Sequence, residues 1–507
     1  MNVNEMSESV VTPSFATNTE MSRISFDERI STGISELDEV LDGGLLAYRT
    51  YLVRGNPGSG KTTLGFHFLT AGTKKGETTL FISIGEFEAQ IRRDAAMQGL
   101  DLSAVLFLDM SMSAEFLNDE QQYHSHTSNS GQEIRETIIY TIIQEVKRLR
   151  PQRVFLDSIS QLRRLTPNAL QYRRQLLAFL QFFAAQGSTV VITSESVDLA
   201  TDEDLQAICD GIISLSNSPE RQTLSVGKYR GSGFLRGDHT LRLSERGLEV
   251  FPHLLPEMSH QEENYEIETL SSGVPELDAL LHGGLERGTV SIITGPSGVG
   301  KTSMGIQFMK EAAVRGERSL VYIFDEAEET LLHRCEAINI PVRSMMKQGR
   351  LLIKRVEPLH FTPDEFAHSV RKEIEQEPTA MVMFDSISGY RLSMRGEDMV
   401  PHLHALCQRL QNNGLTVLLV NDVEAITGGF RATEIGISYM ADNIVFLRYI
   451  EMQGEIHRTV GVLKKRLTGF ERALRKWEIT QYGITVGPPM TNLRGILSGI
   501  PELIENS

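Results

Sequence analysis

The chain has 507 residues, which is long for one domain and natural for two. Its net charge of −16 argues against a nucleic-acid-binding protein, and no apolar run approaches the ~18 residues that span a bilayer, so neither nucleic acid nor a membrane is an expected partner. Three dispersed cysteines and an N-terminus without a secretory pattern argue against a disulfide framework, a zinc knuckle or export, and favour a cytoplasmic protein.

An internal repeat organises the chain after residue 24. Residues 1–24 are rich in Ser, Thr, Asn and Glu, which predicts a flexible tail. The segment STGISELDEVLDGGL at 31–45 then returns as SSGVPELDALLHGGL at 271–285, an offset of 240 residues. We therefore predict two similar domains, at 25–250 and 269–490, joined by an acidic, Pro-containing linker at 251–268 and followed by a C-terminal loop and tail at 491–507.

Short apolar runs recur in the same order in both halves. The first half contains TYLVRG, TLFIS, RVFLDS and TVVITSE, and the second contains TVSIITG, SLVYIF, MVMFDS and TVLLVND. Such runs are typical of strands buried on both faces of a parallel sheet, and the longer stretches between them, such as 168–186, have helical spacing. Alternating strands and helices predict a doubly wound, mostly parallel α/β domain, present twice.

Each half also contains the pattern G-x-x-x-x-G-K-[ST] between a predicted strand and a predicted helix. Backbone N–H groups of such a loop cradle phosphate, its Lys reaches the β- and γ-phosphates, and its Thr hydroxyl binds Mg²⁺. We therefore expect two sites for ATP with Mg²⁺. The predicted nucleotide-binding residues are Gly55, Asn56, Pro57, Gly58, Ser59, Gly60, Lys61, Thr62 and Thr63, and Gly295, Pro296, Ser297, Gly298, Val299, Gly300, Lys301, Thr302 and Ser303.

An aspartate ends one apolar run in each half, Asp157 in FLDS and Asp385 in MFDS. A carboxylate in this place completes the magnesium site of many P-loop proteins, so Thr62 with Asp157 and Thr302 with Asp385 are the predicted metal ligands. The alternative is that each Asp only caps the following helix.

Acidic residues follow the strand after each P-loop. Glu86 and Glu326 are related by the offset of 240, and they are preceded by Gly85 and Asp325. A carboxylate here can orient or deprotonate the group that attacks the γ-phosphate. The alternative is a solvated acid at a helix N-terminus, where the helix dipole favours negative charge.

A Lys-x-Arg pair lies late in each half, Lys228 with Arg230 and Lys464 with Arg466. Because each pair is far along the chain from its own P-loop, we predict that it stabilises the departing γ-phosphate of a neighbouring subunit. The alternative is the charged face of an edge strand.

These features together resemble the KaiC family of circadian clock proteins over residues 25–500. The resemblance implies two tandem RecA-like P-loop domains and a homo-hexamer with ATP between subunits. It also implies ATP hydrolysis in the N-terminal domain and serine/threonine autokinase and autophosphatase activity in the C-terminal domain. A KaiB-like protein is the partner that the resemblance suggests.

Several positions depart from the family's pattern. Its two adjacent catalytic glutamates fall on Gly85 and Glu86, and on Asp325 and Glu326. Its phosphorylated Ser–Thr pair falls on Ser438 and Tyr439, so the expected phosphoacceptors are Ser438 and a nearby threonine, Thr433. The tail that binds KaiA has no counterpart after Ser507, so KaiA is not an expected partner.

Two alternatives of different class remain open. A DNA-processing ATPase of the RecA or RadA type would need a basic, aromatic channel segment, and QLRRLTPNALQYRR at 161–174 is the one stretch of that composition. A nucleotide-gated scaffold with little turnover is the other, and Gly85 favours it.

Overall fold

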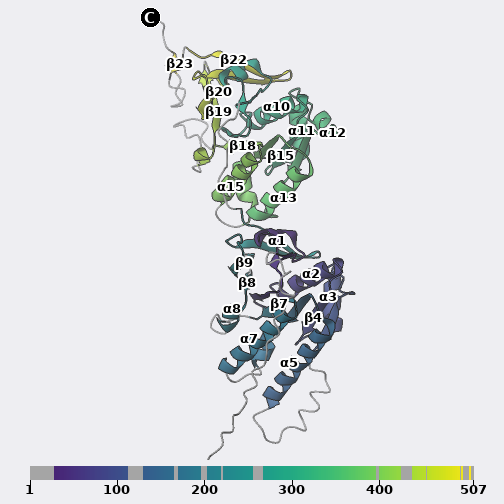
Figure 1. Ribbon diagram of the computed structural model, residues 1–507. Coiled ribbons are helices and arrows are strands. Elements are labelled where there is room, and N and C mark those ends of the chain that lie inside the picture. The colour runs from purple at the N-terminus through teal and green to yellow at the C-terminus, as the bar shows by residue number, and fades with distance from the viewer. Residues whose placement is uncertain are drawn as a thin grey trace, which may run out of the picture. The chain divides into compact units, whose positions relative to one another are not determined.

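The computed structural model describes residues 28–111, 130–164, 169–195, 203–218, 221–254, 267–395, 399–423, 437–452, 454–491, 493–494 and 502–503. The predicted N-terminal tail, Thr433, residues 255–266 of the predicted linker and most of 491–507 lie outside these ranges. The chain divides into two compact units, Met1–Val250 and Phe251–Ser507 (Figure 1).

The first unit alternates strands and helices up to β8 and ends in a run of strands. Its elements are β1 (Arg29–Ile30), α1 (Ser35–Val40), β2 (Leu45–Leu46), β3 (Thr50–Gly55), α2 (Lys61–Lys74), β4 (Thr79–Ser83), α3 (Glu88–Met97), β5 (Leu106–Asp109), α5 (Ser130–Leu149), β6 (Arg153–Asp157), α6 (Ile159–Arg164), α7 (Ala169–Ala185), β7 (Thr189–Ser194), α8 (Glu203–Ile208), β8 (Gly211–Asn217), β9 (Gln222–Tyr229), β10 (His239–Ser244) and β11 (Gly247–Phe251).

The second unit repeats this order. Its elements are β12 (Thr269–Leu270), α9 (Pro275–Leu280), β13 (Leu285–Glu286), β14 (Val290–Gly295), α10 (Lys301–Val314), β15 (Ser319–Ile323), α11 (Glu328–Glu336), α12 (Val342–Lys347), β16 (Leu351–Arg355), α13 (Pro363–Gln376), β17 (Met381–Asp385), α14 (Ile387–Ser393), α15 (Met399–Asn412), β18 (Thr416–Asp422), the 3₁₀ turn η3 (Ile437–Tyr439), β19 (Asn443–Met452), β20 (Glu455–Lys465), β21 (Arg475–Thr480), β22 (Gly483–Pro489), β23 (Leu493–Arg494) and β24 (Glu502–Leu503).

Each unit is built on a nine-stranded, mostly parallel sheet. The strand order is β5-β4-β6-β7-β3-β8-β9-β10-β11 in the first unit and β16-β15-β17-β18-β14-β19-β20-β21-β22 in the second. The strands from β16 to β19 in that order pair in parallel, and β19 to β22 pair antiparallel. The predicted fold class, two tandem α/β domains with mostly parallel sheets, is confirmed.

Helices cover both faces of each sheet, which is why the strands are apolar throughout. Neighbouring residues of β14 show this directly, because Ile292 packs with α13, α14 and α15 whereas Ile293 packs with α9, α10 and α11. Leu52 and Val53 of β3 divide in the same way between the two cores of the first unit. A strand with two buried faces cannot alternate apolar and polar residues.

The repeated segment before each P-loop strand is a structural device. The Ser31 hydroxyl donates to Asp38 Oδ2 (2.6 Å), and the Thr32 N–H donates to Asp38 Oδ1 (2.7 Å). In the second unit Asp278 accepts the equivalent bonds from the Ser271 hydroxyl (2.5 Å) and the Ser272 N–H (2.7 Å). The carboxylate thereby fastens the turn that leads into α1 or α9, and this explains the recurrence of S-[ST]-G…LD.

Among the described residues, every helix is too short or too polar to cross a membrane.

His67 of α2 supports the last strand of the first sheet. Its Nε2 accepts the Leu248 N–H (3.0 Å), which requires the neutral imidazole. Burial, with a smaller effect of the Lys74 charge, lowers the pKa of His67 from 6.5 to about 4. The contact therefore contributes its full stability above the unfolded pKa of 6.5 and loses it as the pH falls toward 4.

We predict that His67→Gln, whose amide oxygen can accept the same bond without titrating, removes this pH dependence from the first unit. The free energy of unfolding of the wild type should fall by about 1–2 kcal/mol between about pH 7 and about pH 5, and the variant should not show this loss. The measurement is the difference in melting temperature between the two proteins at both pH values. An unchanged difference would contradict the prediction.

Candidate active site

The P-loop of the second unit connects β14 to α10, and its backbone conformation explains its glycines. Gly298 and Gly300 have positive φ of 75° and 111°, and a Cβ on Gly300 would lie 2.5 Å from Ile479 Cδ1. Gly58 and Gly60 of the first unit have φ of 77° and 97°. Only glycine combines these conformations with so close an approach, and the resulting turn places the first N–H groups of the helix at the loop.

The lysine of each loop folds back over it. Lys61 Nζ donates to the carbonyls of Gly55 (2.9 Å) and Asn56 (3.0 Å), and burial lowers the pKa of this Lys. Lys301 Nζ donates to the Pro296 carbonyl (2.8 Å) and also pairs with the Asp422 carboxylate (2.7 Å). Each ammonium group is held at the place where phosphate oxygens would meet it.

The predicted metal ligands meet in both units. The Thr302 hydroxyl donates to Asp385 Oδ2 (2.7 Å), and the Thr62 hydroxyl donates to Asp157 Oδ2 (2.6 Å). Burial, opposed by the Thr302 bond and reinforced by the Glu326 charge, raises the pKa of Asp385 to about 6. The half-buried Asp385 carboxylate and the Thr302 hydroxyl together form a hard oxygen donor set that fits Mg²⁺.

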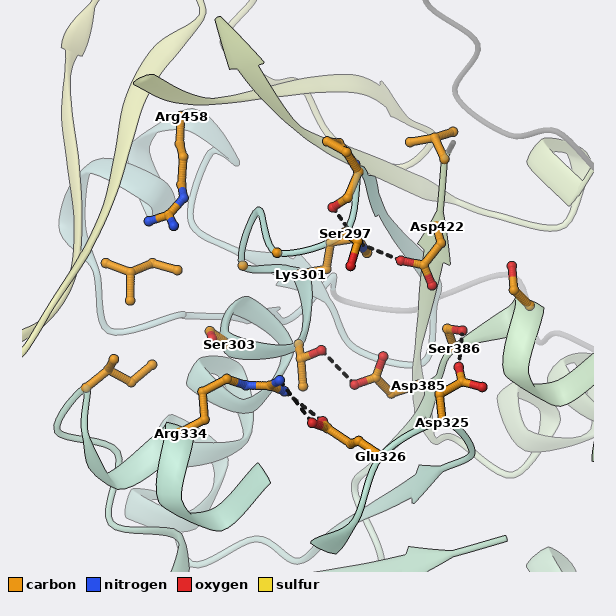
Figure 2. A pocket seen from close by; sticks show the side chains of 18 of the residues that line it. Ser297, Lys301, Ser303, Asp325, Glu326, Arg334, Asp385, Ser386, Asp422 and Arg458 are labelled. Atoms are coloured by element: carbon orange, nitrogen blue, oxygen red, sulfur yellow. Dashed lines mark hydrogen bonds and ion pairs between the residues drawn. The ribbon is translucent and has the colours of Figure 1, made fainter. Parts of the chain in front are cut away.

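Lys301, Thr302 and Asp385 line a cavity of about 1080 Å³ in the second unit (Figure 2). The P-loop residues Lys301 and Thr302 face the acids of the β15–α11 turn across it. Glu326 accepts two bonds from the Arg334 guanidinium, at 2.7 and 3.0 Å. Asp325 accepts a bond from the Ser386 hydroxyl (3.0 Å). Two carboxylates with fixed orientation therefore lie in one cavity with the loop.

The first unit differs at this point. Glu86 is exposed, and partial burial together with the negative charges of Asp157, Asp94 and Glu195 raises its pKa. Asp94 stands where the offset of 240 residues places Arg334 in the second unit. The same carboxylate position thus has a cationic partner in one unit and a like-charged neighbour in the other.

Four charged residues of the second cavity were missed by the sequence reasoning: Arg334, Arg391, Asp422 and Arg458. Asp422 ends β18 beside Gly295 in the parallel register, and the acid that closes TVLLVND was the available signal. Arg458 of β20 directs its guanidinium into the cavity (Figure 2). Nothing in the repeat marks Arg458, because its counterpart on β9 is Gln222.

The Lys-x-Arg pairs bind backbone carbonyls of their own chain. Lys464 Nζ donates to the carbonyls of Ser438 (3.0 Å) and Ala441 (2.6 Å), and Arg466 donates to the Tyr439 carbonyl (2.9 Å). In the first unit Lys228 donates to the carbonyls of Gln206 (2.6 Å) and Ala207 (3.2 Å), and Arg230 donates to the latter (3.1 Å). Each pair therefore holds the segment before a strand, which is the end of α8 before β8 and η3 with Ala441 before β19.

Ser438 lies on η3, half-buried, and Tyr439 beside it is exposed, with its ring edge-on to His404 (5.2 Å between centroids). The described residues that line the 1080 Å³ cavity include neither Ser438 nor the Lys464–Arg466 pair. The expected acceptor and the expected transfer site are therefore not brought together within one chain.

The basic stretch at 161–174 is helical wherever it is described, at 161–164 and 169–174. Arg163 lies over the Tyr172 ring (5.9 Å), and Arg173 pairs with Asp204 (3.2 Å). These contacts are those of a helical surface.

Comparison with known families matches what the geometry suggests. A family model described as the KaiC ATPase matches residues 30–254 and again residues 270–491. The chain belongs to the KaiC family. It is a KaiC-type P-loop ATPase with the ATPase domain present twice.

Individual KaiC proteins are similar over nearly the whole chain. Circadian clock protein KaiC3 of Synechocystis is 26% identical over 483 residues, 94% of each chain. The circadian clock oscillator protein KaiC of Prochlorococcus marinus (strain MIT 9313) is 26% identical over 488 residues, covering 94% of this chain and 96% of its own. That of Parathermosynechococcus lividus is 25% identical over 482 residues, covering 93% and 88%.

We predict that Asp385→Asn and Asp157→Asn each weaken magnesium-dependent nucleotide binding in one domain only. Asparagine keeps the shape but removes the charged oxygen, so the magnesium concentration for half-maximal binding should rise at least tenfold, about 1.4 kcal/mol. The measurement is the binding of a fluorescent ATP analogue at increasing magnesium concentrations. At low magnesium, each variant should bind about half as much analogue per chain as wild type.

Asp109→Asn is the matched control and should bind as wild type does, because Asp109 ends β5, which β4 separates from β6 in the sheet. Loss of both sites in either variant, or of neither, would contradict the assignment of these aspartates.

Proposed function

We propose that this KaiC-family ATPase binds ATP with Mg²⁺ in both domains and assembles into a nucleotide-dependent hexamer. In that assembly the second domain phosphorylates a serine of the ring, and the protein acts as a timing or signalling component. The observation that carries the proposal is the second cavity, where a P-loop lysine, a Thr–Asp pair and two oriented carboxylates meet.

Each group in the second cavity has a role in phosphoryl transfer. The loop N–H groups and Lys301 neutralise the phosphates, and Thr302 with Asp385 would hold the magnesium ion, which supplies charge neutralisation when bound. Glu326, oriented by Arg334, or Asp325, oriented by Ser386, accepts the proton of the attacking hydroxyl. Arg458 adds positive charge on the opposite wall.

The placement of Ser438 supports transfer between subunits. Ser438 is not among the described residues that line its own domain's cavity, which supports transfer of the γ-phosphate from ATP held by another copy of the chain. Lys464 and Arg466 fasten the backbone of Ser438 and Tyr439, which holds the acceptor turn still and places two cations beside it. A fixed acceptor lowers the entropic part of the barrier.

The first domain is proposed to hydrolyse ATP, with Glu86 as the carboxylate that orients water. Its raised pKa brings it closer to the range of a general base. Asp94 in place of Arg334 leaves the carboxylate less constrained, and this favours a second candidate function, a scaffold in which the first domain binds ATP with little turnover. Steady-state ATP turnover of Lys301→Ala, which isolates the first domain, distinguishes the two.

The relatives' names support the timing role, since they are described as circadian clock proteins. A KaiB-like protein is the proposed partner. Tyr439 stands where the family has threonine, so we do not expect the family's two-step Ser/Thr cycle in its usual form and propose one principal phosphoacceptor, Ser438. Thr433 remains a second proposed acceptor.

We predict that Lys61→Ala chiefly damages ring assembly and bulk ATP hydrolysis, whereas Lys301→Ala chiefly damages phosphotransfer. Acids and cations concentrate in the second cavity, so the two lysines serve different reactions. Light scattering in saturating ATP and Mg²⁺, together with ATP turnover and phosphate incorporation, measures all three properties. Identical defects in both variants would refute different roles for the two domains. Normal ATP hydrolysis by a wild-type protein that stays monomeric would refute the ring.

We predict that incubation with ATP and Mg²⁺ phosphorylates Ser438 and that Ser438→Ala loses this phosphate. Glu326→Gln loses it as well if Glu326, rather than Asp325, accepts the proton. A serine hydroxyl is a poor nucleophile without a carboxylate in reach. Phosphopeptide mapping by mass spectrometry is the measurement, with Tyr439→Phe as the matched control that should retain phosphate at Ser438. If wild type carries none, the protein is an ATPase alone; if Ser438→Ala incorporates as much as wild type, the acceptor is another residue.

A further inference from the structure

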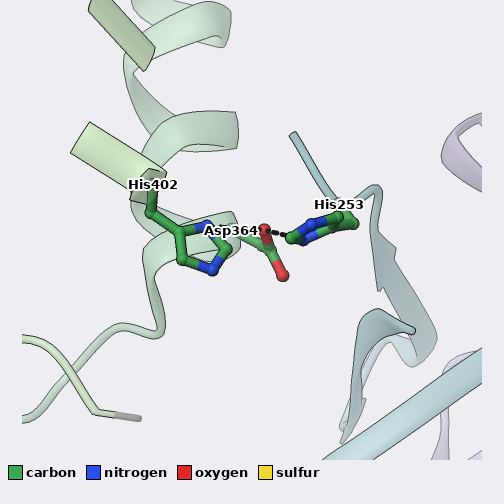
Figure 3. Close-up of side chains that lie close together, drawn as sticks. All are labelled: His253, Asp364 and His402. Atoms are coloured by element: carbon green, nitrogen blue, oxygen red, sulfur yellow. Dashed lines mark ion pairs between the residues drawn. The ribbon is translucent and has the colours of Figure 1, made fainter. Parts of the chain in front are cut away.

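A second group of charged and metal-ligating side chains lies in the second unit, and none of its members lines the nucleotide cavity. We propose that His253, Asp364 and His402 bind a divalent transition-metal ion of the zinc class. Within the part of the chain that the structure describes, each of the three offers a ligand atom that lies within 4.8 Å of the other two. Figure 3 shows the Asp364 carboxylate between the two imidazole rings.

Three separate segments supply these side chains. Asp364 lies in the first turn of α13, whose start is fixed by a capping box between Thr362 and Glu365. His402 projects from α15, which packs against α13. His253 follows β11, in a short segment anchored by Leu254 in the core beneath α13 and α15. Ligands held by helix starts, helix faces and core anchors have little freedom, which is a requirement of a specific metal site.

The distances suit tetrahedral coordination. His253 Nδ1 lies 3.3 Å and His402 Nδ1 lies 3.6 Å from Asp364 Oδ1. Two ligands bound tetrahedrally to zinc at ~2.0–2.1 Å are separated by about 3.3–3.4 Å. The rings are nearly perpendicular, with centroids 5.0 Å apart and an interplanar angle of 82°. An ion can therefore be placed among the three atoms with small side-chain rotations.

Charge and burial favour the same conclusion. The Asp364 side chain is 1% exposed, His402 is 13% exposed and His253 is 29% exposed. A buried carboxylate is costly unless positive charge compensates it, and a divalent ion bound by two neutral imidazoles and one carboxylate does so. The more exposed side, at His253, provides the route of entry and room for a water as fourth ligand.

The ligand types select the metal. Imidazole nitrogen is a ligand of zinc, copper, nickel and iron, whereas magnesium prefers oxygen ligands. The proposed site is thus chemically distinct from the Thr302–Asp385 magnesium site and does not depend on the proposed function. Its consequence is structural, since a bound ion fastens residues 251–254 to α13 and α15.

The test is zinc binding by the full-length chain, purified without a polyhistidine tag, stripped of metal with chelator and returned to millimolar Mg²⁺ without nucleotide. Magnesium then occupies the oxygen sites, so added zinc reports nitrogen sites. Wild type should bind about one zinc ion per chain, and Co²⁺ in its place should give the intense visible absorption of tetrahedral coordination. His253→Gln and Asp364→Asn should each weaken zinc binding at least about 100-fold.

His404→Gln is the matched control, two positions from His402 on the same helix, and it should bind zinc as wild type does. Zinc should raise the melting temperature of wild type and of this control but not of His253→Gln, whose partly exposed position makes it the variant least prone to misfolding. Equal zinc binding by wild type and His253→Gln, or octahedral Co²⁺ spectra in wild type, would overturn the proposal. So would stability that responds to pH but not to zinc, which would identify the cluster as an ion-paired set of protonated histidines.

Discussion

The parallel hydrogen-bond ladder is the constraint on which the active site depends. Pairing β14 with β18 sets Gly295 beside Asp422, and pairing β15 with β17 sets Ile323 beside Asp385. In a parallel sheet all carboxyl ends lie at one edge, so the P-loop, the strand-end aspartates and the acids after β15 converge, although Asp385 lies 83 residues beyond Thr302 in the chain. The Thr302–Asp385 bond is a product of that register rather than its cause.

The two domains use one scaffold for different electrostatics. A glutamate follows the second strand of each core, but its neighbour eight residues later is Asp94 in one domain and Arg334 in the other. In the first case partial burial, together with the negative neighbours, raises the pKa of Glu86, and in the second the Arg334 guanidinium orients Glu326. One residue on the helix, Asp94 on α3 or Arg334 on α11, therefore decides whether the glutamate is weakly constrained or held in a fixed geometry. The fold is the same in both domains.

The part of the repeat that is easiest to see in the sequence does not carry chemistry. In the S-[ST]-G…LD segments, Asp38 and Asp278 accept hydrogen bonds from the turn that precedes their own helix. The segments recur because each domain has the same turn to stabilise. The Lys-x-Arg pairs likewise have a role within the chain, where they hold the end of α8 before β8 and the η3 turn before β19. If Lys464 and Arg466 also contact the γ-phosphate of a neighbouring subunit, they must keep these backbone hydrogen bonds while doing so or give them up.

Local sequence patterns were sufficient to predict the fold and the P-loop at the centre of each nucleotide site. Apolar runs of strand length, the helical stretches between them and the G-x-x-x-x-G-K-T loops depend on neighbours in the chain, so the α/β class, the duplication and the KaiC-type P-loops could all be predicted. Arg458, Asp422 and the His253–Asp364–His402 cluster could not, because each depends on which strands and helices become neighbours. Sequence spacing limits contacts within one helix or strand, whereas contacts between elements are decided by sheet order and core packing. The charges that complete the cavity were therefore decided only by the tertiary structure.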